Sequence, residues 1–306
     1  MHQESNGFGQ SRRKFMSVWM GGLALSPLVL KPSMADGRTR VSQQDWTVQQ
    51  VIDLIVKAVP GSPFPQTVDT IKAGTGDQKV TGIVTTMFAT CEVITEAAKL
   101  GANFIIAHEP TFYSHTDATD WLSNSDVYKF KLDLLNTHKI AVWRCHDYVH
   151  SMRPDGVMEG VLKQLDWKKY SDGKMAGLLT MPPVSLEKLI GEMKSKLGIA
   201  ELRYIGDPAQ VVKKVAVMPG AAGGKAQISV IRNADPDVLV VGEISEWETA
   251  EYVRDARFMG KSTSLVVLGH ALSEEPGSEW MAGWLGPQLP GVVIHHIPAK
   301  NPLRFA

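Results

Sequence analysis

Three short apolar runs, each followed by a histidine, constrain the fold of this chain more than any other feature. Runs of β-branched and aromatic residues of this length are typical of buried strands. Stretches with apolar residues at helical spacing separate them, and this alternation of strands and helices predicts an α/β fold. The runs and their histidines are 104–106 with His108, 140–143 with His146, and 265–268 with His270.

The alternation continues along the chain and divides it into two lobes. Residues 48–56 carry apolar side chains on one helical face, and Thr47 before them is suited to be an N-cap. We expect a two-lobe mixed α/β fold, with a first lobe over residues 36–167 and a second over residues 168–306. Further strands are expected at 80–84, 178–182, 215–218 and 238–241, and further helices at 93–98, 127–135, 156–165 and after Ser185.

Charge and cysteine content argue against several classes of protein. The 306 residues include 32 Lys plus Arg and 32 Asp plus Glu, so the formal net charge is zero. With no long run of one sign, we expect no nucleic-acid partner. The two cysteines, Cys91 and Cys145, are too few for a disulfide framework or a cysteine-based zinc site. They either pair or pack as small buried hydrophobes.

The N-terminal segment has the form of an export signal. Residues 11–16 read SRRKFM, an apolar stretch covers residues 18–30, and residues 31–35 end in the small-x-small form of a cleavage site. Glycines and a proline within the apolar stretch argue against a buried helix, and the stretch is too short for a permanent membrane span. We expect residues 1–35 to be a twin-arginine signal peptide and the mature protein to be periplasmic or otherwise extracytoplasmic, without a membrane span.

The three histidines that follow strands are expected to meet at one site. Ligands of open α/β sheets bind beyond the carboxyl ends of the strands, so side chains there can converge although they lie far apart in sequence. Each histidine has a second candidate donor, either adjacent or four residues later, where a helical turn would place both on one face. The six candidate metal ligands are His108, Glu109, His146, His150, His270 and Glu274.

The number and type of these donors indicate a pair of ions. Six donors exceed the needs of one tetrahedral ion and suit two ions that lie close together. A lone histidine at a strand end is more often hydrogen-bonded or exposed than a ligand, but three such pairs in one context favour a metal site. Imidazole with carboxylate suits zinc, iron and manganese alike. The histidines without such partners are interpreted as ordinary residues: His115, His138, His295 and His296.

A glycine-rich loop follows the strand predicted over residues 215–218. Its sequence, GAAGG at residues 220–224, could hold an anion at a helix N-terminus, but its spacing fits neither a P-loop nor a dinucleotide motif. A tight strand-to-helix turn is the simpler interpretation. No Gly-x-Ser-x-Gly motif occurs, and a serine or cysteine nucleophile is not indicated, although Cys145 beside His146 is the residue that would reopen this.

Three motifs and the end of the chain carry a resemblance to a known family. The motifs are IIAHEP at residues 105–110, VVGEISE at residues 240–246 and GHALSE at residues 269–274, and NP stands at residues 301–302. From about residue 46 to residue 302 the chain resembles the NIF-three-like dinuclear metal-centre family, also called the GTP cyclohydrolase I type 2 homologue family. This resemblance implies a dinuclear metal cleft between two α/β lobes and a homo-oligomer, commonly a homohexamer.

Two positions depart from the usual pattern of that family. Where the family normally has the second histidine of an HHP motif, this chain has Glu109, and where it normally has an aspartate four residues after His146, this chain has His150. The exchange is reciprocal and keeps four histidines and two carboxylates, so the charge of the ligand set is unchanged. We interpret it as a rearranged, working site. Asp147 and Asp155 remain open as substitute ligands.

The predicted chemistry is that of a metal-dependent hydrolase. Two divalent ions that share a water lower its pKa and produce a hydroxide nucleophile for a small phosphoester or amide substrate. Glu109 and Glu274 are the candidate catalytic residues, because either could relay the proton, and Glu243 or Glu246 could orient a ligand imidazole. GTP is not expected as a substrate outside the cytoplasm. The alternative is a non-catalytic metal-binding or oligomeric scaffold protein, whose site would lack an open coordination position.

Overall fold

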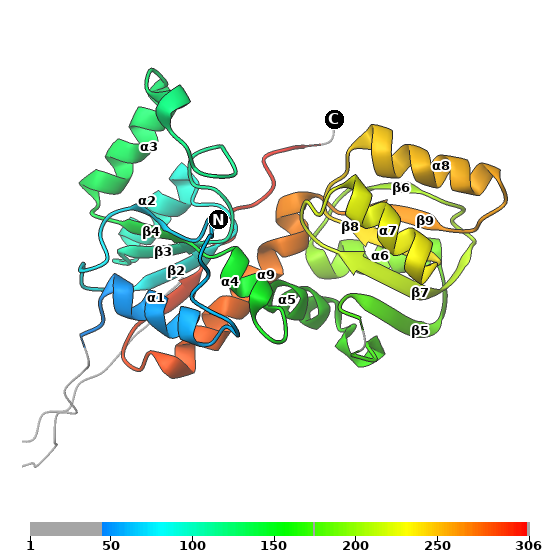
Figure 1. The fold of residues 1–306 in the computed structure, drawn as a ribbon, viewed down its shortest axis with the longest axis horizontal. Coiled ribbons are helices and arrows are strands. Elements are labelled where there is room, and N and C mark those ends of the chain that lie inside the picture. The colour runs from blue at the N-terminus through cyan, green and yellow to red at the C-terminus, as the bar shows by residue number, and fades with distance from the viewer. Residues whose placement is uncertain (1–44, 174, 305–306) are drawn as a thin grey trace, which may run out of the picture. The chain divides into compact units, whose positions relative to one another are not determined.

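The computed structural model describes residues 45–173 and 175–304 of the chain (Figure 1). These residues belong to one compact unit. The predicted signal peptide, residues 1–35, lies outside the described residues and stays a prediction. Among the described residues, no helix has the length and apolar character needed to cross a membrane.

The first lobe is built on a five-stranded sheet whose central strands are parallel. In spatial order the strands are β1 (Ile71–Ala73), β4 (Ala141–Arg144), β3 (Phe104–Ala107), β2 (Ile83–Thr86) and β10 (Ile294–His296). β1 is antiparallel to its neighbour, and the other four strands run parallel. The carboxyl ends of β2, β3 and β4 therefore lie along one edge of the sheet, as the sequence predicted for the last two.

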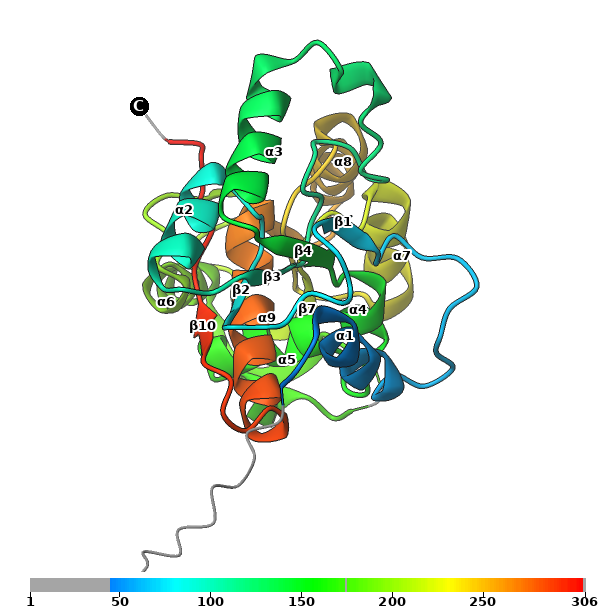
Figure 2. The same cartoon turned by 90° about the vertical axis from the view of Figure 1, so that its left-hand side faces the viewer.

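Helices cover both faces of this first sheet (Figure 2). They are α1 (Val48–Lys57), α2 (Cys91–Lys99), α3 (Asp126–Thr137), α4 (Asp147–Ser151), α5 (Gly156–Leu165) and α9 (His270–Leu285). Because side chains alternate along a strand, Ile105 and Val142 pack with α2 and α3, whereas Phe104 and Trp143 pack with α1, α5 and α9. Burial on both faces explains why these strands are continuous apolar runs.

The second lobe repeats this plan with a second five-stranded sheet. In spatial order its strands are β5 (Leu178–Ser185), β7 (Val211–Met218), β8 (Val238–Val241), β9 (Ser264–Val267) and β6 (Arg203–Ile205). The three central strands are parallel, and β5 and β6 are antiparallel edges. Its helices are α6 (Leu186–Leu197), α7 (Gly224–Ala234) and α8 (Glu251–Phe258).

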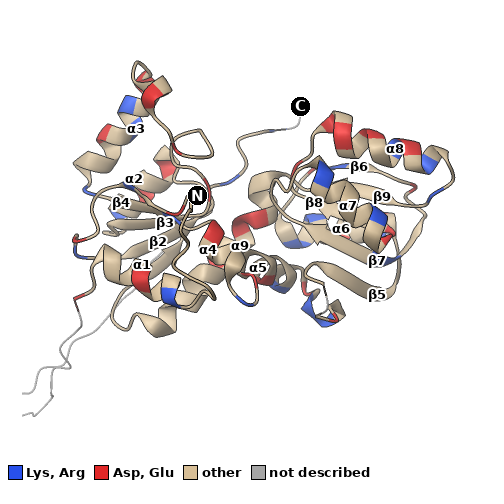
Figure 3. Ribbon diagram, viewed as in Figure 1, with Lys and Arg blue, Asp and Glu red and all other residues tan. Residues whose placement is uncertain are grey.

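The two faces of the second sheet belong to different apolar clusters. Val215 and Val240 pack with α6 in the large cluster that also holds α5 and α9, whereas Ala216 and Leu239 pack with α7 and α8. The large cluster is therefore shared by the two sheets. Residues of both signs of charge are distributed over the helices around each sheet (Figure 3).

Local signals account for most element boundaries. The side-chain oxygen of Thr47 accepts a hydrogen bond from the backbone N–H of Gln50, and the side-chain oxygen of Gln50 accepts one from the backbone N–H of Thr47. This capping box confirms the predicted start of α1. Ser185 likewise caps α6. The strand predicted from residue 80 begins later, at Ile83, because Val80 instead donates its backbone N–H to the Trp46 carbonyl.

The described residues confirm the predicted mixed α/β class, with two sheets and nine α-helices. Several elements were not predicted. The short strands β1, β6 and β10 were missed, and so was the length of α9, which contains Pro276. β10 and α9 pack in the first lobe, so that lobe draws on both sides of the division predicted at residue 167.

Candidate metal centre

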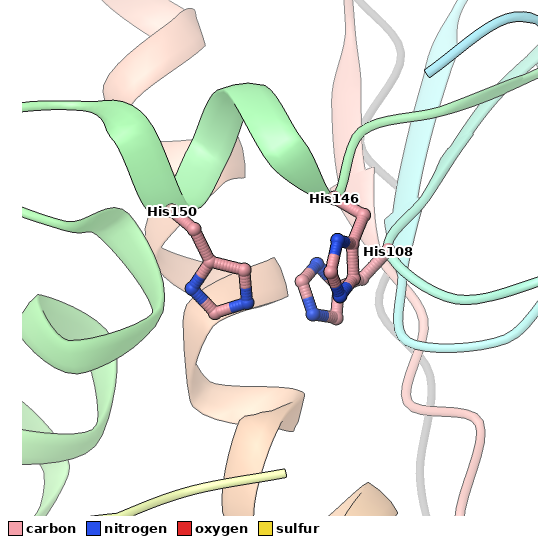
Figure 4. A group of neighbouring side chains, drawn as sticks. All are labelled: His108, His146 and His150. Atoms are coloured by element: carbon pink, nitrogen blue, oxygen red, sulfur yellow. The ribbon is translucent and has the colours of Figure 1, made fainter. Parts of the chain in front are cut away.

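The six predicted ligands lie together, although three separate segments supply them. Two follow β3, two belong to α4 and the residue before it, and two lie in the first turns of α9. Ligand atoms of His108, His146 and His150 lie within 4.8 Å of one another, and so do those of His108, Glu109 and Glu274. Figure 4 shows the three imidazole rings gathered beside α4. His108 therefore joins an imidazole-rich group to a carboxylate-rich group.

Glu109 offers one carboxylate oxygen to this cluster and binds a buried arginine with the other. Its Oε1 lies 3.3 Å from Nε2 of His270 and 3.8 Å from Nε2 of His146. Its Oε2 accepts a hydrogen bond of 2.9 Å from Arg144, whose side chain is fully buried. Burial raises the pKa of Glu109, but the hydrogen bond with His270 and the surrounding positive charges bring the pKa below its ordinary value.

Arg144 is the last residue of β4 and had no role in the predictions from the sequence. Besides Glu109, it donates hydrogen bonds to the main-chain carbonyls of His108 and His115, so it holds the loop that carries two of the ligands. Its charge also offsets that of Glu109. The exchange that places Glu109 and His150 in the cluster keeps the charge of the six candidate ligands. In addition, the buried cation Arg144 balances the charge of Glu109.

Glu274 is buried and packs against the glycine-rich loop after β7. Its Oε2 lies 3.0 Å from Nε2 of His270 and 3.4 Å from Nε2 of His108, and its Oε1 lies 3.9 Å from Nε2 of His150. Burial raises the pKa of Glu274, but the adjacent imidazoles of His108 and His270 outweigh this and hold the pKa far below its ordinary value. A Cβ atom at Gly220, where φ is +70°, would overlap this carboxylate.

The same loop presents no open anion site at the start of α7. Gly223 is the N-cap of that helix and makes no side-chain capping bond. The side chain of Glu248 lies so close to Gly224 that a Cβ atom there would overlap its carboxylate. A carboxylate of the protein therefore lies at the positive end of α7, where an external anion would otherwise be favoured.

Each of the four imidazoles has an oxygen atom beside its Nδ1 as well. A proton on Nδ1 satisfies such an oxygen and leaves the lone pair of Nε2 facing the cluster, which is the tautomer that a metal ligand needs. The contacts are His108 with the Cys145 carbonyl at 3.2 Å, His146 with Asp147 at 2.9 Å, His150 with Asp155 at 3.0 Å, and His270 with Glu243 at 3.5 Å.

These outer contacts assign the carboxylates that the sequence left open. Asp147 and Asp155 lie beside Nδ1 atoms, so they orient imidazoles instead of joining the inner group. Glu243 lies in the same position, 3.5 Å from Nδ1 of His270. Glu246 does not, because it is exposed and pairs with Arg203.

The imidazoles differ in their affinity for protons. Burial lowers the pKa of His270, but its hydrogen bonds with Glu109 and Glu274 outweigh burial and raise the pKa to about 10. Burial, together with the charge of His108, lowers the pKa of His146. Burial also lowers the pKa of His150, yet the hydrogen bond with Asp155 leaves it raised. The cluster therefore gathers groups that compete for positive charge.

One buried atom tests whether this cluster fits a metal ion. Nε2 of His108 is buried and has no hydrogen-bond partner among the described residues. Leaving a buried polar atom without a partner costs about 1–3 kcal/mol. A ring nitrogen whose lone pair faces carboxylates and two other imidazoles matches the donor chemistry of a divalent transition metal. The residues therefore fit the ion.

Comparison with known proteins gives the family. The model of the Duf34/NIF3 (NGG1p interacting factor 3) family matches residues 47–302. The chain belongs to the Duf34/NIF3 family. A GTP cyclohydrolase 1 type 2 homolog from Clostridium perfringens is 28% identical over 216 residues, which cover 67% of this chain and 78% of that protein. The resemblance predicted from the sequence is confirmed at the level of the family.

Solved structures agree on the fold of this Duf34/NIF3 chain. A Staphylococcus aureus hypothetical protein has a TM-score of 0.70 at 19% identity, over 86% of this chain and 100% of that chain. A Bacillus cereus protein related to NIF3 has a TM-score of 0.69 at 15% identity, with the same coverage. At these identities the likeness shows the fold alone.

A pocket of about 950 Å³ opens beside the cluster of the Duf34/NIF3 chain, and Glu109 and His270 line it. His115 lines it too, and its ring lies 6.2 Å from that of His146. The sequence interpretation of His115 as an ordinary residue missed this, because the residue lies in a loop without a recognisable motif. Both cysteines are free, so the pairing that the sequence left open is not found.

Proposed function

We propose that this Duf34/NIF3 protein is a metal-dependent hydrolase whose six clustered side chains hold two divalent ions. The observation that carries the proposal is the shared orientation of the four imidazoles, with Nε2 toward two carboxylates and Nδ1 toward outer oxygen atoms. His108, His146 and His150 would hold one ion, and Glu109 and Glu274, with His270 beside them, would hold the other. The donor set suits zinc, iron or manganese.

The chain itself would bind the substrate and handle protons. Divalent ions bound here would lower the pKa of a water molecule and polarise the phosphoryl or carbonyl oxygen of a small phosphoester or amide. Glu109 lines the pocket, and Arg144 fixes one of its oxygens, so the other oxygen is placed to accept a proton at the pocket wall. Glu274 is enclosed by Gly220 and the imidazoles, and we assign it to holding the ions.

The pocket favours an enzyme over a closed binding site, because a hydrolase needs a position that a substrate can reach. Export by the twin-arginine route to the periplasm belongs to the proposal and rests on residues 11–35 of the sequence. Assembly as a homo-oligomer, up to the hexamer that the family resemblance implies, also belongs to it. A non-catalytic metal-binding scaffold is the alternative outcome.

The first test is the metal content of the purified protein by plasma mass spectrometry, without chelators. We expect about two ions per chain, and clearly fewer in Glu109→Ala and in His150→Ala. His138→Ala is the matched control, because His138 is exposed at the end of α3. Hydrolysis of 4-nitrophenyl phosphate and of a 4-nitroanilide is then measured on the same samples. Bound ions without turnover of either compound would favour the scaffold, and unchanged metal content in both variants would refute the metal centre.

A further inference from the structure

Lys131 is a buried cation in the wall of the pocket beside the metal centre. It lies on α3, its side chain is 4% exposed, and its Nζ donates a hydrogen bond of 2.6 Å to the Thr111 carbonyl. Among the described residues, no carboxylate lies within ion-pair distance of it. A buried ammonium group without a counterion is costly, so its retention in a pocket wall indicates a use.

Aromatic rings surround the same ammonium group. Nζ of Lys131 lies 5.9 Å from the ring centroid of Phe112 and 5.1 Å from that of Tyr113. Tyr113 is half-exposed, lines the pocket, and has a φ of 62°, which is unfavourable for a residue with a side chain. Backbone strain of this kind is concentrated at functional sites. Here it places an aromatic ring 5.1 Å from the ammonium group, in the wall of the same pocket.

Other parts of the pocket also favour an anion. The first turn of α2 contributes Thr90, Cys91 and Glu92, and the N-terminus of a helix carries a partial positive charge. Lys300 and Arg304 of the C-terminal segment line the pocket as well. Burial lowers the pKa of Lys131 to about 8, while the neighbouring thiol of Cys91 and the carboxylate of Asp117 act in the opposite direction.

Two carboxylates in the wall act against an anion and are accounted for by their surroundings. Glu109 is paired with Arg144, so its charge is balanced within the protein. Glu92 is exposed to solvent, where its charge is screened. The C-terminal segment is held in place by Glu275, which accepts a hydrogen bond of 2.8 Å from the backbone N–H of Ala299. The buried lysine is therefore the strongest recognition element in the wall.

We propose that this pocket binds a small organic anion with a flat apolar body, through the ammonium group of Lys131 and the rings of Phe88 and Tyr113, all of which line the pocket. The anionic group is separate from the bond that is cleaved, so the substrate of the hydrolase is an acid that also carries an ester or amide. Only the statement that the bound molecule is a substrate rests on the proposed function. The binding site itself is independent of it.

The experiment titrates the full chain, stripped of metal, with 4-nitrobenzoate and with its neutral analogue 4-nitrobenzamide, by isothermal calorimetry at pH 7. We expect the benzoate to bind, and Lys131→Met to bind it about tenfold more weakly, as the loss of a charge-assisted hydrogen bond implies. Lys129→Met is the matched control, because Lys129 is an exposed lysine on the same helix. Inorganic phosphate is titrated in parallel to distinguish a tetrahedral from a planar anion.

A second variant guards against loss of folding. Lys300→Gln combined with Arg304→Gln changes only exposed residues of the pocket wall, and we expect about threefold weaker binding of the benzoate. Equal binding of benzoate and benzamide, or full binding by Lys131→Met, would overturn the proposal. Metal content is measured on the same preparations before the metal is stripped. Ions without anion binding would refute this inference alone, whereas anion binding without ions would refute the metal centre alone.

Discussion

The two sheets of the molecule bring the same kind of edge to the candidate metal centre and contribute to it in different ways. β3 and β4 of the first sheet lead into His108 and His146, which offer ring nitrogens. β7 and β8 of the second sheet lead into Gly220 and Gly242, where a Cβ atom would overlap Glu274 and the Gly220 backbone, respectively. The first sheet supplies donor atoms directly after its strands. In the second sheet β9 leads into His270 and Glu274 of α9, and β7 and β8 supply the space for them. A strand end can thus be functional because it lacks a side chain.

The largest expected effect tests the donor side of this comparison. Arg144→Met removes the buried cation that binds Glu109 and leaves this carboxylate with imidazole neighbours only. Removing one member of a buried pair costs about 3–5 kcal/mol. Urea unfolding of the metal-free protein measures this. Arg203→Met is the control, since the Arg203–Glu246 pair is exposed and should contribute about 0–1 kcal/mol. Equal losses in the two variants would mean that Arg144 does not support Glu109.

The next effect tests the space that the second sheet leaves. Gly220→Ala adds a Cβ atom against the Glu274 carboxylate at a φ of +70°, and we expect a loss of about 2–4 kcal/mol together with a lower metal content. Gly101→Ala is a closely matched control, because Gly101 has the same φ and nothing within 4 Å of the added atom. It should cost about 1–2 kcal/mol and leave the metal content unchanged. If both variants behave alike, backbone strain alone explains the role of Gly220.

The difference between the two sheets also explains how much the sequence could predict. Donor residues at strand ends are visible in the sequence, because an apolar run that stops at a histidine is a local pattern. His108, His146 and His270 were found in this way, and their neighbours followed from spacing. Arg144 could not be assigned, since its partner Glu109 lies on a different strand end and the pairing depends on the order of the strands.

Elements that are short, or buried on most sides, were not predicted from the sequence for a different reason. α9 buries Ser273, Glu274, Pro276 and Gly277 as well as apolar residues, so it shows no amphipathic stripe and contains a helix-breaking residue. β10 has three residues and pairs with β2, more than 200 residues earlier in the chain. Neither α9 nor β10 can be predicted from the residues of its own segment. The role of Gly220 was equally hidden, because a close approach can be seen only when the approaching group is known.

A smaller effect tests whether the carboxylates outside the cluster support metal binding through the imidazoles that they contact. Asp155 caps α5 with one oxygen and contacts Nδ1 of His150 with the other. Asp155→Asn keeps a capping oxygen but can lose the acceptor for His150, so we expect nearly unchanged stability and about 10–100-fold weaker metal binding. Competition with a chelator measures the affinity. Asp166→Asn, an exposed aspartate paired with Lys169, should have no effect, and an equal affinity in both variants would show that Asp155 serves only as a cap.

The smallest expected effect concerns Lys131 and depends on pH. Burial lowers its pKa from 10.5 to about 8, so below pH 8 the folded state holds a charge at a cost of about 3 kcal/mol relative to the unfolded chain. Lys131→Met removes that cost but loses the hydrogen bond to Thr111 and the contacts with two rings, worth about 2 kcal/mol together. At pH 7 the variant should therefore be more stable by about 1 kcal/mol.

The sign of this difference should reverse as pH rises. Between pH 8 and about 10.5 the unfolded chain binds more protons than the folded one, so the wild type gains stability while Lys131→Met does not. Above that range the amine of Lys131 is neutral in both states, so its hydrogen bond to Thr111 and its packing against the two rings remain, and the wild type should be the more stable protein. Cys91, Tyr113 and Asp117 interact with this ammonium group, so both proteins carry Cys91→Ser to remove ionisation of the thiol. Urea unfolding from pH 7 to pH 10.5 locates the crossing. A wild type that is more stable at every pH would mean that Lys131 is a structural residue. Its burial would then need no explanation from anion binding.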